Sequence, residues 1–390
     1  FIQKSALGAI GTSFLPQFLN GMDAYSFAEN MKRLVVIQLS GGNDGLNTIV
    51  PFENDNYYHM RPSIAISKGQ VLRLNDVLGM HPSLEALHEL YKEGFVSIVN
   101  SVGYPNPNRS HFRSMDIWQS GVGADTYSKT GWIGRYMDAY CEHPHASIEI
   151  DSALSLSLYG EKFNGMALEN SARLKNLLNQ PYFRELIERS ETMDLDEDNL
   201  GYLYKTLIQT NQSAEYIAEK HDVKNANVQF PSSKLGKDLN IVSQFIRSGL
   251  NSQVYYVSQN GYDTHVGQKR KQSKLLGDFA QSLRAFVHSL QKSKDFDNTL
   301  ILVFSEFGRR LKQNGSGGTD HGKANNLFLI GKNIQNPGVY NKAPDLIDLD
   351  DGDVQYTIDF RNVYADVIRD WFGKNEKEII RKDFASLGII

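Results

Sequence analysis

The chain has a single cysteine, Cys141, among its 390 residues. It can therefore form no internal disulfide framework, and it cannot build a zinc site from cysteines. An excess of charge of one sign is also missing, because the formal net charge is −4 and no basic stripe with interleaved aromatic residues marks a nucleic-acid surface. The composition is that of an ordinary globular protein, with 41% hydrophobic and 22% charged residues. We expect no nucleic-acid partner, and any metal ion must be held by carboxylates and histidines.

A long hydrophobic run is absent as well. The segment SALGAIGTSFLP at 5–16 is weakly apolar, and it is too short and too rich in glycine to span a bilayer as a helix. It looks like part of a twin-arginine export signal whose arginine pair stands just upstream; the alternative is an amphipathic N-terminal helix. We predict that residues 1–30 are a leader, that the protein is periplasmic or secreted, and that it has no transmembrane segment.

Continuous apolar runs alternate with amphipathic segments along the rest of the chain. The expected strands cover 34–39, 95–99, 147–150, 253–257, 299–304 and 327–330, and the expected helices cover 83–93, 110–119, 132–140, 275–290 and 364–372. Such runs are typical of parallel strands buried on both faces. The sequence therefore predicts an α/β fold with a mainly parallel sheet between helices, in one domain over 31–390. Residues 170–250 are polar with a helical pattern, and we predict a helical insertion or cap there.

Acidic residues and histidines recur where the predicted strands end. Three strands end in such residues, and a glycine-rich loop after the third adds two more: Asp44, then Asp263 with His265, then Glu306, and finally Asp320 with His321. Because ligands of open α/β sheets bind at the carboxyl ends of strands, these six residues are candidate metal ligands. The two-residue spacing of Asp263 and His265 places both on one side of an extended segment.

Several of these residues also have a structural explanation. Asp263 and His265 could shape a turn through local hydrogen bonds, and Glu306 could pair with the nearby Arg309. Asp320 could support a ligand rather than be one. The recurrence at several strand ends is what favours a metal site.

Ser110 is the second candidate centre, because it opens the helix predicted after the turn at 104–109. A serine at this position is commonly an N-cap and nothing more. The same position would suit a nucleophile, since a helix N-terminus stabilises an attacking alkoxide and an anionic substrate. Arg109 and His111 could add charge or hydrogen bonds to a phosphate or sulfate. Ser110, Arg109 and His111 are therefore the candidate catalytic residues.

Six motifs spread over nearly the whole chain: LSGGNDG at 39–45, NRSHF at 108–112, GYDTH at 261–265, SEFGR at 305–309, GTDHG at 318–322 and GDVQYTIDFR at 352–361. Together they resemble a secreted bacterial family known as uncharacterised-domain family 1501 (DUF1501). That family is itself distantly similar to the alkaline phosphatase and sulfatase superfamily.

The superfamily resemblance implies an alkaline-phosphatase-like architecture and metal-assisted hydrolysis of a phosphate or sulfate ester. It implies that Ser110 matches the nucleophile and that Asp44 matches the carboxylate after the first strand. Asp263, His265 and His321 would match the ligands of one metal. The expected substrate is an anionic small molecule or a glycan ester.

Glu306 and Phe307 fall where the superfamily commonly has an Asp-His pair, and Phe307 cannot bind a metal. We therefore expect one divalent metal rather than two, with zinc as the first expectation and calcium, manganese or magnesium as alternatives. Loss of a ligand also favours an alternative function, that of a non-catalytic secreted binding protein on a degenerate hydrolase scaffold.

Overall fold

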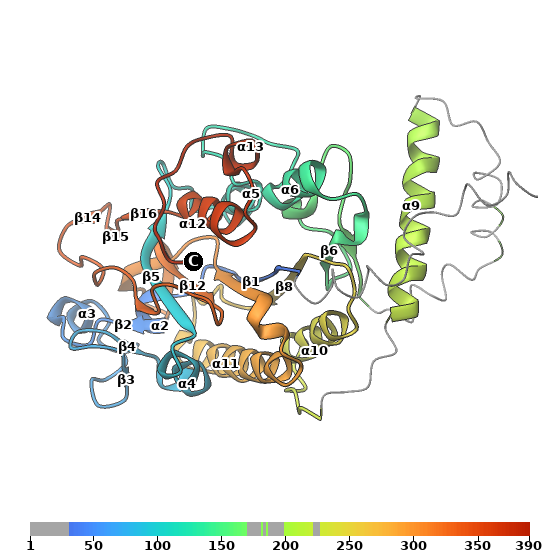
Figure 1. Cartoon of the computed structure of the whole chain (residues 1–390). Coiled ribbons are helices and arrows are strands. Elements are labelled where there is room, and N and C mark those ends of the chain that lie inside the picture. Colours follow the sequence, from blue (N-terminus) through green and yellow to red (C-terminus); the bar gives the residue numbers. More distant parts are fainter. Residues whose placement is uncertain (1–30, 170–180, 182–184, 186–198, 221–226) are drawn as a thin grey trace, which may run out of the picture.

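A computed structural model describes residues 31–169, 181, 185, 199–220 and 227–390 (Figure 1). The predicted leader at 1–30 lies outside the described residues, as does much of the segment from 170 to 198. In the described part of the chain, a central sheet lies between two layers of helices (Figure 1). No helix among these residues combines the length and the apolarity needed to cross a membrane.

The central sheet has nine strands within the described residues. In spatial order they are β13 (Gly338–Val339), β5 (Val96–Gly103), β12 (Asn325–Ile330), β9 (Thr299–Phe304), β1 (Arg33–Ser40), β8 (Val254–Asn260), β6 (Ser147–Glu149) and β7 (Met166–Ala167), and β16 (Ile358–Asp359) pairs with β5. Every neighbouring pair is parallel except the two formed by β12, which runs antiparallel to β5 and β9. The predicted fold class, a mainly parallel sheet between helices, is confirmed.

Helices cover both faces of the sheet (Figure 1). One layer contains α4 (Glu85–Lys92), α10 (Lys234–Arg247) and α11 (Gln268–Ser293), and the other contains α5 (His111–Ser120), α6 (Trp132–Tyr140), α12 (Phe360–Asp366) with the π-helical turn Val367–Trp371, and α13 (Glu376–Ile380). Strand β1 shows why both faces are apolar. Val35 and Ile37 belong to the cluster under the first layer, whereas Leu34 and Val36 belong to the cluster under the second.

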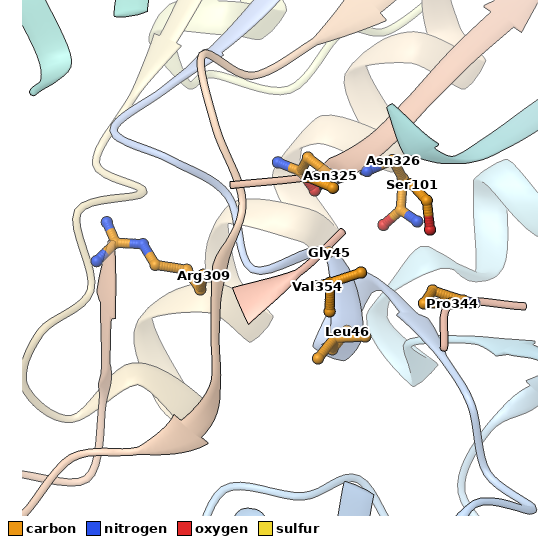
Figure 2. Close-up of a pocket in the computed structure, with 9 residues that line it drawn as sticks. Gly45, Leu46, Ser101, Arg309, Asn325, Asn326, Pro344 and Val354 are labelled. Carbon is orange, nitrogen blue, oxygen red and sulfur yellow. Dashed lines mark hydrogen bonds between the residues drawn. The ribbon is translucent and has the colours of Figure 1, made fainter. Parts of the chain in front are cut away.

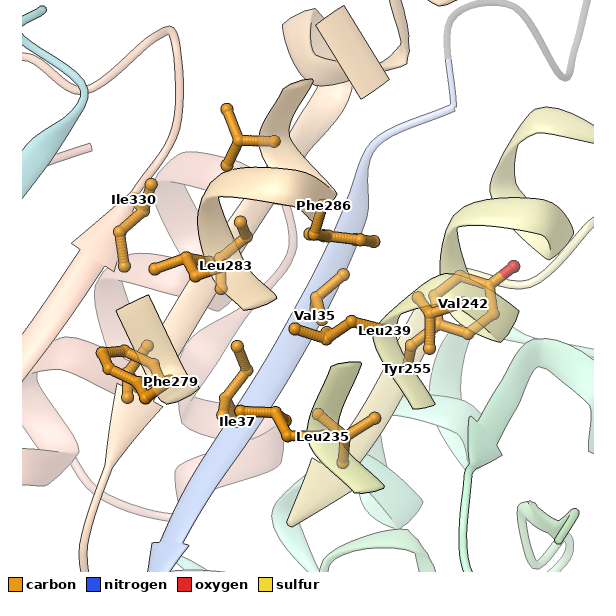
Figure 3. Packing of buried hydrophobic residues seen from close by; sticks show 14 of the residues in the cluster. Val35, Ile37, Leu235, Leu239, Val242, Tyr255, Phe279, Leu283, Phe286 and Ile330 are labelled. Carbon is orange, nitrogen blue, oxygen red and sulfur yellow. The ribbon is translucent and has the colours of Figure 1, made fainter. Parts of the chain in front are cut away.

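Helix α10 lies inside the 170–250 segment and packs onto the sheet. Its Leu235 and Leu239 lie against Val35 and Ile37 of β1, and Leu283 of α11 lies beside them (Figure 3). Helix α9 (Asn199–Lys220) precedes it and contacts the 3₁₀ turn Pro144–Ala146. The stretch 234–247 is therefore part of a main helical layer.

Two helices begin earlier than predicted. Helix α11 starts at Gln268, because its first two turns carry the polar run QKRKQSK, which shows no apolar periodicity in the sequence. The C-terminal helix starts at Phe360, where the Asp359 side chain accepts a hydrogen bond from Arg361 N. A side-chain cap marks the start of the C-terminal helix and α11 has none, so a hydrophobic pattern does not predict either start.

Short elements gather around a third apolar cluster that includes Leu46, Phe52, Leu311 and Val354. They are α2 (Gly45–Thr48), β2 (Ile49–Val50), α3 (Asp55–Met60), β3 (Leu72–Arg73), β4 (Gly79–Met80), β10 (Arg309–Gln313), β11 (Thr319–His321), β14 (Leu349–Asp350) and β15 (Asp353–Val354). Elements α2 and β10 follow the ends of β1 and β9, so this cluster adjoins the carboxyl edge of the sheet.

Candidate metal centre

Four ligand-type side chains meet at the carboxyl edge of the sheet. Asp263 and His265 lie in the loop after β8, His321 ends β11, and His111 opens α5. The Nε2 atoms of His111, His265 and His321 lie 3.5, 3.1 and 3.2 Å from Oδ1 of Asp263. The Nε2 atoms of His265 and His321 are 2.9 Å apart. We call these four residues the histidine–aspartate cluster.

The spacing of the cluster fits a small divalent cation. Ligand atoms about 2.1 Å from a tetrahedral zinc ion lie about 3.4 Å from one another. One ligand atom from each of His111, Asp263 and His321 lies within 4.8 Å of the others. Small movements of the side chains would therefore bring these atoms into a coordination shell. Of the six residues that the sequence proposed as ligands, Asp263, His265 and His321 come together here.

The far side of each imidazole ring is held by an acceptor. The Nδ1 atom of His111 lies 2.8 Å from Glu306 Oε1, that of His265 lies 3.2 Å from Asp320 Oδ1, and that of His321 lies 2.8 Å from the carbonyl oxygen of Arg109. Histidines that bind metals in proteins have such outer partners almost without exception. These outer partners orient the three rings, and the Nε2 atom of each ring lies within 3.5 Å of Asp263 Oδ1.

Glu306 lies behind His111, not among the converging ligand atoms. It is fully buried, and its Oε1 accepts hydrogen bonds from Gly41 N at 2.8 Å and from His111. Its Oε2 lies 3.3 Å from Ser305 Oγ, which donates its proton to Leu39 O at 2.6 Å. Asp320 likewise lies behind His265. The structure thus gives both carboxylates the outer position that the sequence had left open for Asp320.

Asp44 is used elsewhere. It caps α2 by accepting from Leu46 N at 3.2 Å and Asn47 N at 3.4 Å, and it forms a fully buried ion pair with Arg61 at 2.5 Å. Gln268 also donates to its carboxylate. These contacts occupy both oxygens of Asp44, and the structure does not bring it into the histidine–aspartate cluster.

A single guanidinium ties the loops of the site together. Arg309 is buried and donates from Nε to Gly42 O at 2.6 Å, from Nη1 to Thr319 O at 2.9 Å and from Nη2 to the carbonyl of Tyr262 at 3.0 Å. Its Nη2 also donates to Gly41 O and, at 2.8 Å, to Asp263 Oδ1. The strand-end partner expected for Glu306 is in fact the partner of Asp263.

Hydrogen bonds lower the pKa values of two aspartates, Asp263 in the cluster and Asp320 behind His265. Burial acts to raise the pKa of Asp263, but the hydrogen bond and the positive charge of Arg309 outweigh it and lower that pKa to about 2. The hydrogen bond from Asn314, followed by the one from His265, lowers the pKa of Asp320. The hydrogen bond to Glu306 raises the pKa of His111, whereas burial lowers that of His321.

Ser110 is exposed and directly precedes His111 at the start of α5. Its hydroxyl makes no capping hydrogen bond, and its backbone N–H donates to Asn108 Oδ1 at 2.8 Å. The alternative explanation, a hydrogen-bonding N-cap, therefore does not account for this serine. Its position beside the cluster leaves its hydroxyl available.

The guanidinium of Arg109 pairs with two aspartates outside the cluster. Its guanidinium pairs with Asp353 and, at 2.9 Å, with Asp351, while its carbonyl holds His321. Asp353 is fully buried, so this pairing fixes the turn that precedes α5. Two carboxylates therefore pair with the guanidinium of Arg109, and a contact of this side chain with a phosphate or sulfate stays a prediction.

Phe307 is only 2% exposed and packs on two of the histidines. Its ring centroid lies 4.8 Å from that of His111 and 4.8 Å from that of His321. The residue that the sequence marked as a lost ligand is therefore part of the wall of the cluster.

A small pocket lies next to this region but is distinct from it. Its walls include Gly45, Leu46, Asn325 and Asn326 (Figure 2). None of the four cluster residues lines it. Asn325 donates to the carbonyls of Asn43 at 3.0 Å and Phe307 at 2.9 Å, so this pocket wall supports two of the loops that carry the site.

Comparison with protein families gives one match. Residues 215–379 match the family described as "Protein of unknown function (DUF1501)". The predicted resemblance to DUF1501 is confirmed. The matched segment contains Asp263, His265 and His321, whereas His111 lies before it. No curated protein matches the sequence.

Three solved structures are similar to this chain. Ps i-CgsB in complex with k-i-k-neocarrahexaose has 10% identity and a TM-score of 0.43, over 92% of this chain and 75% of that one. A protein in the alkaline phosphatase superfamily from Vibrio parahaemolyticus has 11% identity and a TM-score of 0.40, over 91% and 71%. The C-terminal periplasmic domain of EcEptC from Escherichia coli, in complex with Zn, has 9% identity and a TM-score of 0.34, over 78% and 74%. Scores of this size transfer neither activity nor ligands to this chain.

Proposed function

We propose that the protein is an exported metal-dependent hydrolase of phosphate or sulfate esters. The observation that supports this most is the convergence of three imidazole Nε2 atoms on Asp263 Oδ1, at 3.1 to 3.5 Å, where parallel strands end. A bound divalent cation would supply Lewis acidity and would lower the pKa of a nucleophile beside it.

The chain itself would supply ligands, orientation and a nucleophile. Asp263, His265 and His321 would hold the metal, and Asp320 would fix the ring of His265. Ser110 offers an exposed hydroxyl at the N-terminus of the ten-residue helix α5, where the helix dipole favours a negatively charged ester. The expected substrate is an anionic small molecule or glycan ester, and the expected metal is zinc.

The first test is a substrate screen on protein of measured metal content. Wild type, Asp263→Asn and Ser110→Ala would each be loaded with zinc and assayed against aryl phosphates, phosphodiesters and aryl sulfates. We expect turnover of one ester class by wild type, abolished by a chelator and lost in Asp263→Asn. Equal activity of Ser110→Ala and wild type would remove Ser110 from the reaction. No turnover of any class by metal-loaded wild type would refute the hydrolase.

Phe307 favours a second candidate, a secreted protein that binds such esters without hydrolysing them. Its ring packs against both His111 and His321, at the position where a hydrolase with two metals would need a ligand. Calorimetric binding of a sulfated or phosphorylated glycan to the zinc-loaded protein, with no product formed, would support this candidate.

Export is a separate part of the proposal and rests on the segment 5–16. Cell fractionation of the full chain, with and without residues 1–30, tests it. Recovery of both forms in the same compartment would argue against a leader in this segment.

A further inference from the structure

We propose that His111 is a metal ligand, which completes a mononuclear centre of three histidines and one aspartate, and that Glu306 positions His111 instead of binding a second ion. This inference rests on the metal site of the proposed function but not on hydrolysis.

The hydrogen bonds fix which ring nitrogen of each neutral histidine carries the proton. The carbonyl oxygen of Arg109 can only accept, so Nδ1 of His321 must donate to it. The carboxylates of Glu306 and Asp320 likewise accept from Nδ1 of His111 and of His265. In each neutral ring, the Nε2 atom is then left with a lone pair.

Three Nε2 lone pairs therefore lie near one carboxylate oxygen, Oδ1 of Asp263. The Nε2 atom of His111 is buried and makes no hydrogen bond. The Nε2 atoms of His265 and His321 are 2.9 Å apart, and both lie within 3.2 Å of Asp263 Oδ1. The three Nε2 lone pairs and the Asp263 oxygen repel one another, and a cation bound among them would stabilise the arrangement.

His111 belongs to this set by distance and by orientation. Its Nε2 lies 3.5 Å from Asp263 Oδ1, close to the spacing of about 3.4 Å between ligands of a tetrahedral zinc. Its ring meets that of His321 edge to face, with centroids 4.4 Å apart. Phe307 packs against both rings and limits their movement.

The same contacts give the carboxylates that a second ion would need other partners. Glu306 Oε1 accepts from Gly41 N and His111, while Asp44 is committed to Arg61. Phe307 offers no ligand atom. His111 thus occupies Oε1 of Glu306, an oxygen that a second metal would need as a ligand.

The test counts metal ions and imidazole ligands directly. Zinc content per chain would be measured by elemental analysis, and the number of coordinated imidazoles by X-ray absorption at the zinc edge. We expect one zinc and three imidazoles for wild type, and two imidazoles with at least tenfold weaker zinc binding for His111→Ala. We expect Glu306→Gln to keep three imidazoles while binding zinc about ten- to a hundredfold more weakly.

Two further proteins make the outcome decisive. His59→Ala, which removes an exposed histidine on α3, should match wild type in zinc affinity and imidazole count. His111→Gln guards against misfolding of the alanine variant and should also lose one imidazole.

The inference is overturned by two imidazoles in wild type, by an unchanged count in either His111 variant, or by two zinc ions or none per chain. A three-imidazole centre in a protein that turns over no ester would instead refute the proposed hydrolase alone.

Discussion

Asp44 and Arg61 are both fully buried, and Arg61 Nη1 lies 2.5 Å from Asp44 Oδ2. Removing one partner of a buried pair leaves the other charge without compensation. We predict that Asp44→Asn lowers the free energy of unfolding by about 3–5 kcal/mol, measured by urea denaturation of metal-free protein. Zinc stoichiometry should not change, because Asp44 is not part of the histidine–aspartate cluster.

A matched control for this substitution is available on the surface. The pair between Asp297 and Lys332 is half exposed, and Asp297→Asn should cost less than about 1 kcal/mol. A similar loss of stability in both variants, or a loss of zinc in Asp44→Asn, would contradict the role assigned to Asp44.

The buried carboxyl group of Glu149 should make the free energy of unfolding depend on pH. It is 4% exposed at the end of β6, and burial raises its pKa to about 7 although it accepts a hydrogen bond from Ser155 N at 2.6 Å. Between about pH 4.5 and 7 the unfolded state has lost this proton and the native state has kept it. Stability contributed by the neutral carboxyl is therefore complete at low pH and falls as pH rises through this window.

We predict that wild type loses about 3 kcal/mol of unfolding free energy from this group between pH 4.5 and pH 7.5. Glu149→Gln should lack this component, so the difference in stability between the two proteins should change with pH by that amount. Denaturant titrations at several pH values measure it, and parallel curves would show that Glu149 does not titrate in this range.

At the scale of elements, the hairpin of β10 and β11 is pressed against the loop after β8. A Cβ atom on Gly318 would lie 2.3 Å from the backbone of His265. We predict that Gly318→Ala displaces His265 and weakens zinc binding at least tenfold, as measured by competition with a chelator. Gly315→Ala, in the same hairpin, has no atom within 4 Å of the added Cβ and should bind zinc as wild type does.

Elements with a strong local signal could be predicted from the sequence. Strands β1, β8 and β9 are continuous apolar runs, and Asp263 and His265, which follow β8, are found at the sheet edge where the pattern placed them. The short strands β10 and β11 carry no such pattern, because their stability comes from packing on neighbouring loops.

The sequence predicted where the cluster lies better than it predicted which residues form it. His111 joins it because the turn before α5 is fixed by Arg109 and Asp353, a contact between distant parts of the chain. No spacing in the sequence reports that contact. For the same reason, the buried partners of Asp44 and Glu306 could not be predicted from their positions after strands.

At the scale of the whole molecule, the cluster should couple metal binding to folding. Zinc that binds only the native state adds about 2.7 kcal/mol to the free energy of unfolding at a concentration one hundred times its Kd. We predict this gain for wild type, reversed by a chelator, and its loss in Asp263→Asn. Denaturation with and without zinc tests it, and an equal gain in the variant would place the bound ion elsewhere.

Arg309 should determine how the loops around the site unfold locally. Its guanidinium is bonded to the loops after β1 and β8 and to β11, so no one of these segments can separate without breaking charge-assisted bonds to the others. Their amide protons should therefore exchange with solvent in a single cooperative opening. In Arg309→Lys, which lacks the planar fork, the segments should exchange at separate rates, and hydrogen exchange by mass spectrometry would resolve them.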